Sequence, residues 1–241
     1  MPDLEPWRWA LGAVCGFFVG LAKTGMPGLG ILAIPLMVIA VGDAKQSAGW
    51  LLPILCAADL MAIYYWRRHA AAHRLFSLAP GVLVGVAGGA FALSLSETIL
   101  RPLVGGIVLA MLIVYLIRRF RAGSVPSAHP IPYGIAAGFS TTVANAAGPV
   151  MNLYLLSKNL PKEDFVATGA WFFFFINLLK VPVYLYHGLF SRTSLTFDLF
   201  VVPSVFAGAL AGRWLIDRIP TRVFEIAVIV LTAASTLLLF R

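Results

Sequence analysis

Apolar stretches, several of them long enough to cross a lipid bilayer, recur along this 241-residue chain. They run over 8–22, 29–41, 48–66, 76–94, 99–117, 131–156, 165–187, 195–216 and 222–240. About 20 apolar residues in a helix span the roughly 30 Å of hydrocarbon in a membrane. Charged residues make up only 12% of the chain, against about 25% in soluble domains. The sequence therefore predicts an all-α polytopic membrane protein.

The net charge of +8 is concentrated in short loops between the apolar stretches. Loops with excess Lys and Arg lie on the cytoplasmic side of membrane proteins. The basic loops at 67–74, 118–130 and 213–222 are therefore predicted to be cytoplasmic. This distribution does not indicate nucleic acid as a partner.

Two of the apolar stretches are interrupted, at 23–30 by KTGMPGLG and at 140–149 by STTVANAAGP. A straight helix over 7–41 would be about 52 Å long at 1.5 Å per residue, which is too long for one span. We expect this segment to break at 23–30 and to return as two antiparallel pieces or a re-entrant hairpin. The same arrangement is expected around 140–149.

A pattern of small residues occurs twice in the same order. Gly16, Gly20 and Gly30 are repeated as Gly134, Gly138 and Gly148, 118 positions later, and Pro80, Gly85 and Gly89 as Pro203, Gly208 and Gly212, 123 positions later. Asp59 and Asn177 also align at 118. Small residues four apart permit close helix packing, which explains each copy but not its repetition. The sequence predicts one membrane domain with repeats at 1–121 and 131–241 and a cytoplasmic linker at 122–130.

The charges of two equivalent turns indicate how the repeats are oriented. The turn near 95–101 carries one Glu and one Arg, whereas its counterpart at 213–222 carries three Arg and one Asp. Equivalent turns on opposite sides of the membrane define inverted repeats, as in many secondary transporters. Each repeat is expected to have four to five helical segments and to open with a broken hairpin. Both chain termini are predicted to lie outside.

The two interruptions are the predicted binding site. Helix N-termini bind anions, glycine lets a ligand approach the backbone, and inverted repeats place their broken helices together near the bilayer midplane. The predicted substrate-binding residues are Lys23, Thr24, Gly25, Gly28, Gly30, Thr141, Thr142, Asn145, Gly148, Asn177 and Lys180.

Three ionisable residues lie within apolar stretches. A lysine at membrane depth costs roughly 2.5–3.5 kcal/mol, so it usually faces a cavity or a partner. Lys23 either lines the site or lies at a helix end and reaches the surface, whereas Lys180 shares a helical face with Asn177 and Tyr184. Asp59 is a candidate for proton or ion coupling, or else the partner of a lysine.

No pattern of an enzyme is found in the sequence. Nucleophile elbows, P-loops, HExxH and CxxC are missing, and His69 and His73 are expected in a solvated basic loop. The sequence thus predicts no catalytic residue, no cofactor and no metal.

The chain resembles the TauE/SafE family of sulfite-exporter-like anion permeases, also called TSUP. The resemblance rests on residues 16–37, 138–156 and 165–185 and on the paired proline–glycine helices. It implies a multi-pass transporter of sulfite, sulfonates or related sulfur-containing organic anions in a bacterial inner (plasma) membrane. Many members have a small residue where this chain has Lys23. A fixed positive charge there would suit a small dianion or a carboxylate-bearing anion.

These observations favour a secondary transporter that works by alternating access around a midplane site. The alternatives are a passive anion channel, a membrane-embedded enzyme or a non-catalytic assembly partner. The expected partners are a small anionic substrate and the lipid bilayer, and a homodimer is left open.

Overall fold

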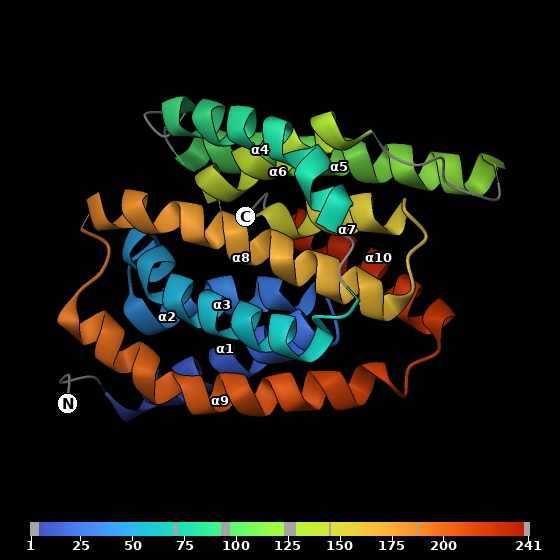
Figure 1. Ribbon diagram of the computed structural model, residues 1–241. Coiled ribbons are helices and arrows are strands. Elements are labelled where there is room, and N and C mark those ends of the chain that lie inside the picture. The colour runs from blue at the N-terminus through green and yellow to red at the C-terminus, as the bar shows by residue number, and fades with distance from the viewer. Residues whose placement is uncertain are drawn as a thin grey trace.

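The computed structural model describes residues 5–69, 72–92, 97–122, 129–144, 146–186 and 188–238 (Figure 1). These residues form ten α-helices and one 3-10 turn, and no strand occurs among them. The elements are α1 (Pro6–Thr24), η1 (Leu29–Leu32), α2 (Ala33–Val41), α3 (Ala44–Trp66), α4 (Ala72–Ala92), α5 (Glu97–Ala122), α6 (Pro130–Ala144), α7 (Ala147–Leu156), α8 (Lys162–Tyr186), α9 (Arg192–Ile216) and α10 (Thr221–Leu238). The all-α prediction is confirmed.

Four helices of the described chain are long and apolar enough to cross a membrane. They correspond to Gln46–Trp66 in α3, Leu75–Ala92 in α4, Lys162–Tyr186 in α8 and Arg192–Ile216 in α9. Shorter apolar pieces are Pro102–Ile117 within α5 and Ala147–Leu156, which is α7. Large apolar side chains such as Phe76, Phe91 and Leu199 are exposed on the outer surface, as expected where a helix bundle faces lipid.

The first interrupted segment is a helical hairpin. α1 continues through Lys23 to Thr24 and α2 begins at Ala33, so the break between the α-helices starts and ends two residues later than the predicted 23–30. Gly28 has a φ of +109°, a backbone conformation that glycine adopts readily and other residues rarely do. α2 then returns along α1, because the Cys15 thiol lies 3.4 Å from the carbonyl oxygen of Ala33.

The second interrupted segment has the same form. α6 ends at Ala144 and α7 begins at Ala147, and the Ala146 N–H donates to the Ser140 carbonyl at 3.1 Å. The rings of Tyr133 in α6 and Tyr154 in α7 are 5.7 Å apart, so α7 lies back along α6. Of the two residues between these helices, Asn145 is outside the described residues.

Each hairpin packs closely against a helix from the other half of the chain. α1 lies along α9, and α6 lies along α4. A Cβ at Gly20 or Gly208 would overlap the backbone across the α1–α9 contact, and a Cβ at Gly138 or Gly85 would do the same between α6 and α4. The glycine motifs of the two halves therefore form two reciprocal helix contacts of the kind that small residues permit.

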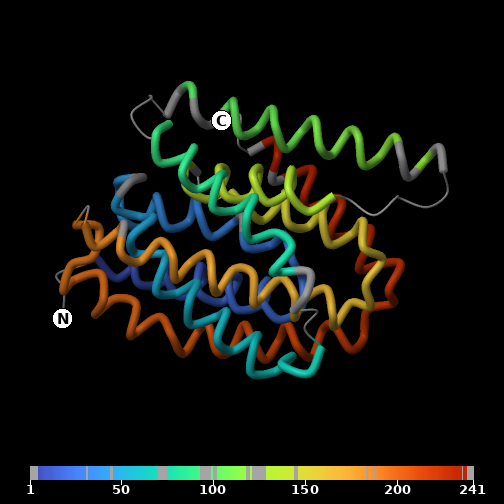
Figure 2. Tube along the Cα trace, turned by 45° about the horizontal axis from the view of Figure 1, so that its top comes forward, coloured from blue at the N-terminus to red at the C-terminus, as the bar shows by residue number. Residues whose placement is uncertain are grey.

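The helices run along one long axis, and several of their connections lie at one end of it (Figures 1 and 2). In Figure 1 the ends of α3, α5 and α9 lie to the right, and the N-terminus lies to the left. At the right-hand end, the Trp66 indole N–H donates to the Thr24 carbonyl at 3.0 Å. The Lys162 ammonium donates to the Ile219 carbonyl, also at 3.0 Å, which ties the start of α8 to the turn between α9 and α10.

Candidate functional site

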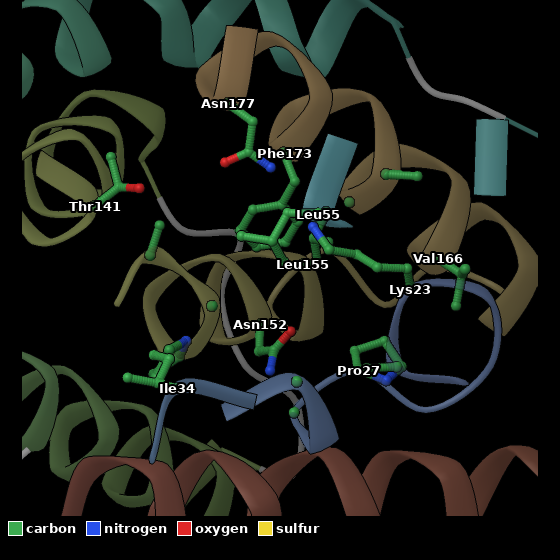
Figure 3. A pocket seen from close by; sticks show the side chains of 18 of the residues that line it. Lys23, Pro27, Ile34, Leu55, Thr141, Asn152, Leu155, Val166, Phe173 and Asn177 are labelled. Carbon is green, nitrogen blue, oxygen red and sulfur yellow. The ribbon is translucent and has the colours of Figure 1, made fainter. Parts of the chain in front are cut away.

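A cavity of about 120 Å³ lies where the two hairpins meet α3 and α8 (Figure 3). This is well above the roughly 10–15 Å³ that admits one water molecule. Its lining comprises Ala22, Lys23, Pro27, Gly28, Gly30, Ile34, Leu51, Leu55, Thr141, Ala147, Gly148, Pro149, Asn152, Leu155, Phe165, Val166, Gly169, Ala170, Phe173, Asn177 and Lys180. The cavity therefore combines a mostly apolar wall with a few polar groups, as small-ligand sites do.

Both halves of the chain supply this wall from matching positions. Five pairs of lining residues are 118 positions apart: Lys23 with Thr141, Gly30 with Gly148, Ile34 with Asn152, Leu51 with Gly169, and Leu55 with Phe173. The positions match, but the residue types do not. The first half places an ammonium group where the second half places a hydroxyl.

Lys23 lines the cavity, and its ammonium group is paired within the protein. Its side chain is 13% exposed, and its Nζ lies 2.6 Å from Oδ1 of Asp59. The same Nζ lies 4.0 Å from the centre of the Phe173 ring, close enough for a cation–π interaction. Because Lys23 is in the last turn of α1, the helix dipole also favours its positive charge.

Asp59 holds Lys23 from behind the cavity wall. Its side chain is 0% exposed, and Oδ2 accepts a hydrogen bond of 2.8 Å from the Asn177 amide. A buried carboxylate is tolerated only where charge partners or hydrogen bonds compensate for lost hydration. Lys23 and Asn177 provide both, so α1, α3 and α8 are joined by one buried polar cluster.

Lys180 lines the cavity from α8 and is 8% exposed. Its Nζ lies 6.0 Å from the centre of the Tyr184 ring one turn further along, and it interacts electrostatically with Lys23 and Asp59. Asn177, Lys180 and Tyr184 therefore share one helical face, as their spacing predicted. The cavity has two ammonium groups in its wall and one carboxylate behind it.

Neutral polar groups line the side formed by the second hairpin. Thr141 belongs to the last turn of α6, and Gly148 to the first turn of α7. A Cβ on Gly148 would meet nothing within 4 Å, so the cavity is open there to the start of a helix, where backbone N–H groups favour anions. The Asn152 amide donates to the Thr232 hydroxyl at 3.2 Å, which ties it to α10.

Three predicted site residues lie outside the cavity lining and hold the hairpins in place. The Thr24 hydroxyl donates to the Ala209 carbonyl of α9 at 2.7 Å. Gly25 packs against the backbone of α9, and Thr142 packs against α4. The other predicted residues that are described, Lys23, Gly28, Gly30, Thr141, Gly148, Asn177 and Lys180, line the cavity together.

Sequence reasoning missed the apolar part of the wall, including Phe173, Leu55 and Val166. Apolar residues are expected everywhere in a membrane helix, so their type carries no signal. The 118-residue offset could have paired Leu55 with Phe173, because both lie on the helices that carry Asp59 and Asn177.

Metal ligands do not gather in the part of the chain that the structure describes, since no group of three or more His, Cys, Asp or Glu is found there. His69 lies at the protein surface, where its Nδ1 is 3.2 Å from Oδ1 of Asp164. This position agrees with a loop residue outside the site.

Comparison with known protein families agrees with the sequence motifs. The family model described as Sulfite exporter TauE/SafE matches residues 11–239. The chain belongs to this family, so it is a multi-pass membrane transporter of sulfur-containing anions and not an enzyme. A search of curated proteins and a search of solved structures found no match.

Proposed function

We propose that this TauE/SafE protein is a secondary transporter that moves a small anion across the cell inner membrane by alternating access. The cargo is sulfite, a sulfonate or a related sulfur-containing organic anion. The observation that supports this most directly is the pair of ammonium groups, Lys23 and Lys180, in the wall of one cavity between the hairpins.

The chemistry of this wall suits a small anion. Lys23 and Lys180 supply charge, Thr141 supplies a neutral hydroxyl donor, and the first turn of α7 supplies the positive end of a helix dipole. The remaining wall is largely apolar and strengthens these electrostatic interactions by excluding water. The proposed site comprises the predicted residues that line the cavity, with Asn152 added and with Asp59 as the coupling candidate.

Inverted repeats at 1–121 and 131–241 account for several independent contacts. Helix α1 packs on α9 as α6 packs on α4, and Asp59 bonds with its counterpart Asn177. The basic ends of α3, α5 and α9 lie at the same end of the bundle (Figure 1). We infer that this end is cytoplasmic and that both termini lie outside; most of the predicted linker at 122–130 falls outside the described residues. Rocking of one repeat against the other would expose the cavity alternately.

The direct test is anion flux into proteoliposomes, screened with sulfite, sulfate, thiosulfate, sulfonates and small carboxylates. Lys23→Ala and Lys180→Ala should each abolish most of the flux. Lys158→Ala is the matched control, because Lys158 lies against Tyr154 outside the cavity lining. Normal transport by both cavity variants would contradict the site.

The same assay separates the alternatives. Saturable uptake that accumulates the anion against its gradient, when driven by an ion gradient, would exclude a passive channel. Flux through the purified protein alone would exclude an assembly partner without transport activity.

A further inference from the structure

The charges around the cavity do not balance. Of the described residues that line it or pair with its lining, Lys23 and Lys180 are cationic and Asp59 is anionic. The titratable groups that interact with Asp59 are Lys23 from α1, the Cys56 thiol from α3 and Lys180 from α8. The polar groups that line the cavity from the second hairpin, Thr141 and Asn152, are neutral. The formal net charge of this cluster is therefore one positive unit when Asp59 is ionised and both lysines are protonated.

Burial makes this imbalance matter. A net charge away from water is costly, and charges interact strongly across the low-dielectric interior. One monovalent anion would bring the cluster to neutrality. A divalent anion would leave one excess negative charge unless a proton were added to the same cluster.

Asp59 is the group placed to take that proton. Both of its carboxylate oxygens are engaged inside the protein, Oδ1 with Lys23 and Oδ2 with Asn177. Protonation of Oδ1 would end the ion pair and leave the Lys23 ammonium to the anion in the cavity. No covalent bond other than the O–H bond forms, and the proton comes from the aqueous side that is open.

Taking the proposed transport function as its basis, we propose that Asp59 sets the charge of the accepted anion. With Asp59 ionised the cavity binds a monovalent anion, and it binds a divalent anion only together with one proton. A fixed positive charge on Lys23 was expected to suit a small dianion or a carboxylate-bearing anion, but the ion pair with Asp59 offsets that charge.

The test uses two probes whose own charge stays constant near neutral pH, methanesulfonate and sulfate. Binding to the purified full-length protein is measured by calorimetry in buffers of different ionisation enthalpy, which reports proton uptake. The wild type should prefer methanesulfonate and should take up about one proton per bound sulfate and none per methanesulfonate. Sulfate binding without proton uptake would overturn the proposal.

Variants test the charge count itself. Asp59→Asn makes the net charge of the cluster more positive by one unit. The sulfate-to-methanesulfonate affinity ratio should therefore rise about tenfold or more, and sulfate should bind without proton uptake. Lys180→Met lowers the net charge of the cluster by one unit and should weaken the binding of both anions. The double variant Asp59→Asn/Lys180→Met restores the wild-type count and should restore the preference for methanesulfonate.

Asp198→Asn is the matched control, because Asp198 is 4% exposed in α9 and lies outside the cavity lining. It should leave the affinity ratio unchanged. If Asp59→Asn has the same affinity ratio as the wild type, the proposed role of Asp59 is refuted. If the wild type binds neither probe nor any other small anion, the proposed function is refuted instead. If Asp59→Asn does not fold, proton uptake by the wild type still decides the question.

Discussion

Asp59 and Asn177 occupy matching positions in the two halves of the chain, 118 residues apart, and are joined by a hydrogen bond of 2.8 Å. The bond lies at the contact between α3 and α8, behind the cavity wall. Two aspartates there would place like charges in contact, and two asparagines would leave the Lys23 ammonium without its carboxylate. The difference between the two halves at this position gives Lys23 its counter-charge.

Replacing Asn177 with Leu should destabilise the protein. The change removes the donor to Asp59 and leaves a buried carboxylate oxygen without it, at a cost of about 1–3 kcal/mol in the free energy of unfolding. The measurement is denaturant unfolding in detergent. Leu178→Ala, at an exposed position on the same helix, should cost less, and equal stability of Asn177→Leu and the wild type would contradict the importance of this bond.

Lys23 and Asp59 should behave as one unit in a double-mutant cycle. Lys23→Met alone leaves a buried carboxylate without its cation and should cost about 3–5 kcal/mol. Adding Asp59→Asn should recover part of that loss, with a coupling of about 0.5–3 kcal/mol between the two changes. The unfolding free energies of the four proteins give the coupling directly, and additive costs would show that the 2.6 Å contact contributes nothing to stability.

Filling the cavity should separate transport from stability. A side chain at Gly148 would meet no atom within 4 Å at its Cβ, so Gly148→Val should fold normally while its methyl groups occupy space needed by the anion. Flux should fall to near background with little change in the unfolding midpoint. Gly106→Val, also at an open position but in α5 outside the lining, should transport normally; loss of flux in both would point to a general defect.

Adding a methyl group to Gly20 should push α1 away from α9. The new Cβ would overlap the backbone of Val205, and forced overpacking typically costs about 1–3 kcal/mol. Gly138→Ala should have a similar cost, because Gly138 abuts the backbone of Val82 in α4 in the same way. Gly106→Ala should be neutral or stabilising, since alanine favours a helix by up to about 1 kcal/mol over glycine. Equal thermal stability of all three variants would show that close helix approach is not needed.

The inverted arrangement predicts labelling from opposite sides of the membrane. Thr98 and Thr221 are equivalent at the 123-residue offset. In a background without native cysteines, Thr98→Cys should react with an impermeant thiol reagent from outside and Thr221→Cys only from the cytoplasm. Reaction of both from one side would rule out inverted repeats.

The sequence alone predicted the elements of this fold well, for reasons that are local. Membrane helices are apolar along a length set by the bilayer, so the stretches at 48–66 and 195–216 correspond closely to α3 and α9. A segment of about 52 Å cannot cross once, which predicted the break near Gly28. The residues on each side of a break depend on cap and packing details, and therefore the first interruption was predicted two residues too early and the second was predicted too long.

What only the tertiary structure decided is the direction and the partner of each polar side chain. Lys23 and Thr24 are neighbours in the sequence, yet one lines the cavity and the other bonds to α9, because successive residues of a helix point about 100° apart. Pairing of Lys23 with Asp59 depends on how α1 packs on α3, and no local pattern encodes that distance. The sequence determined by itself that the chain is a helical membrane protein with two matched, broken halves, since hydropathy, length and repetition are properties of the chain. The tertiary structure decided that Lys23 has a buried counter-charge, because the charge of a site depends on groups that only packing brings together.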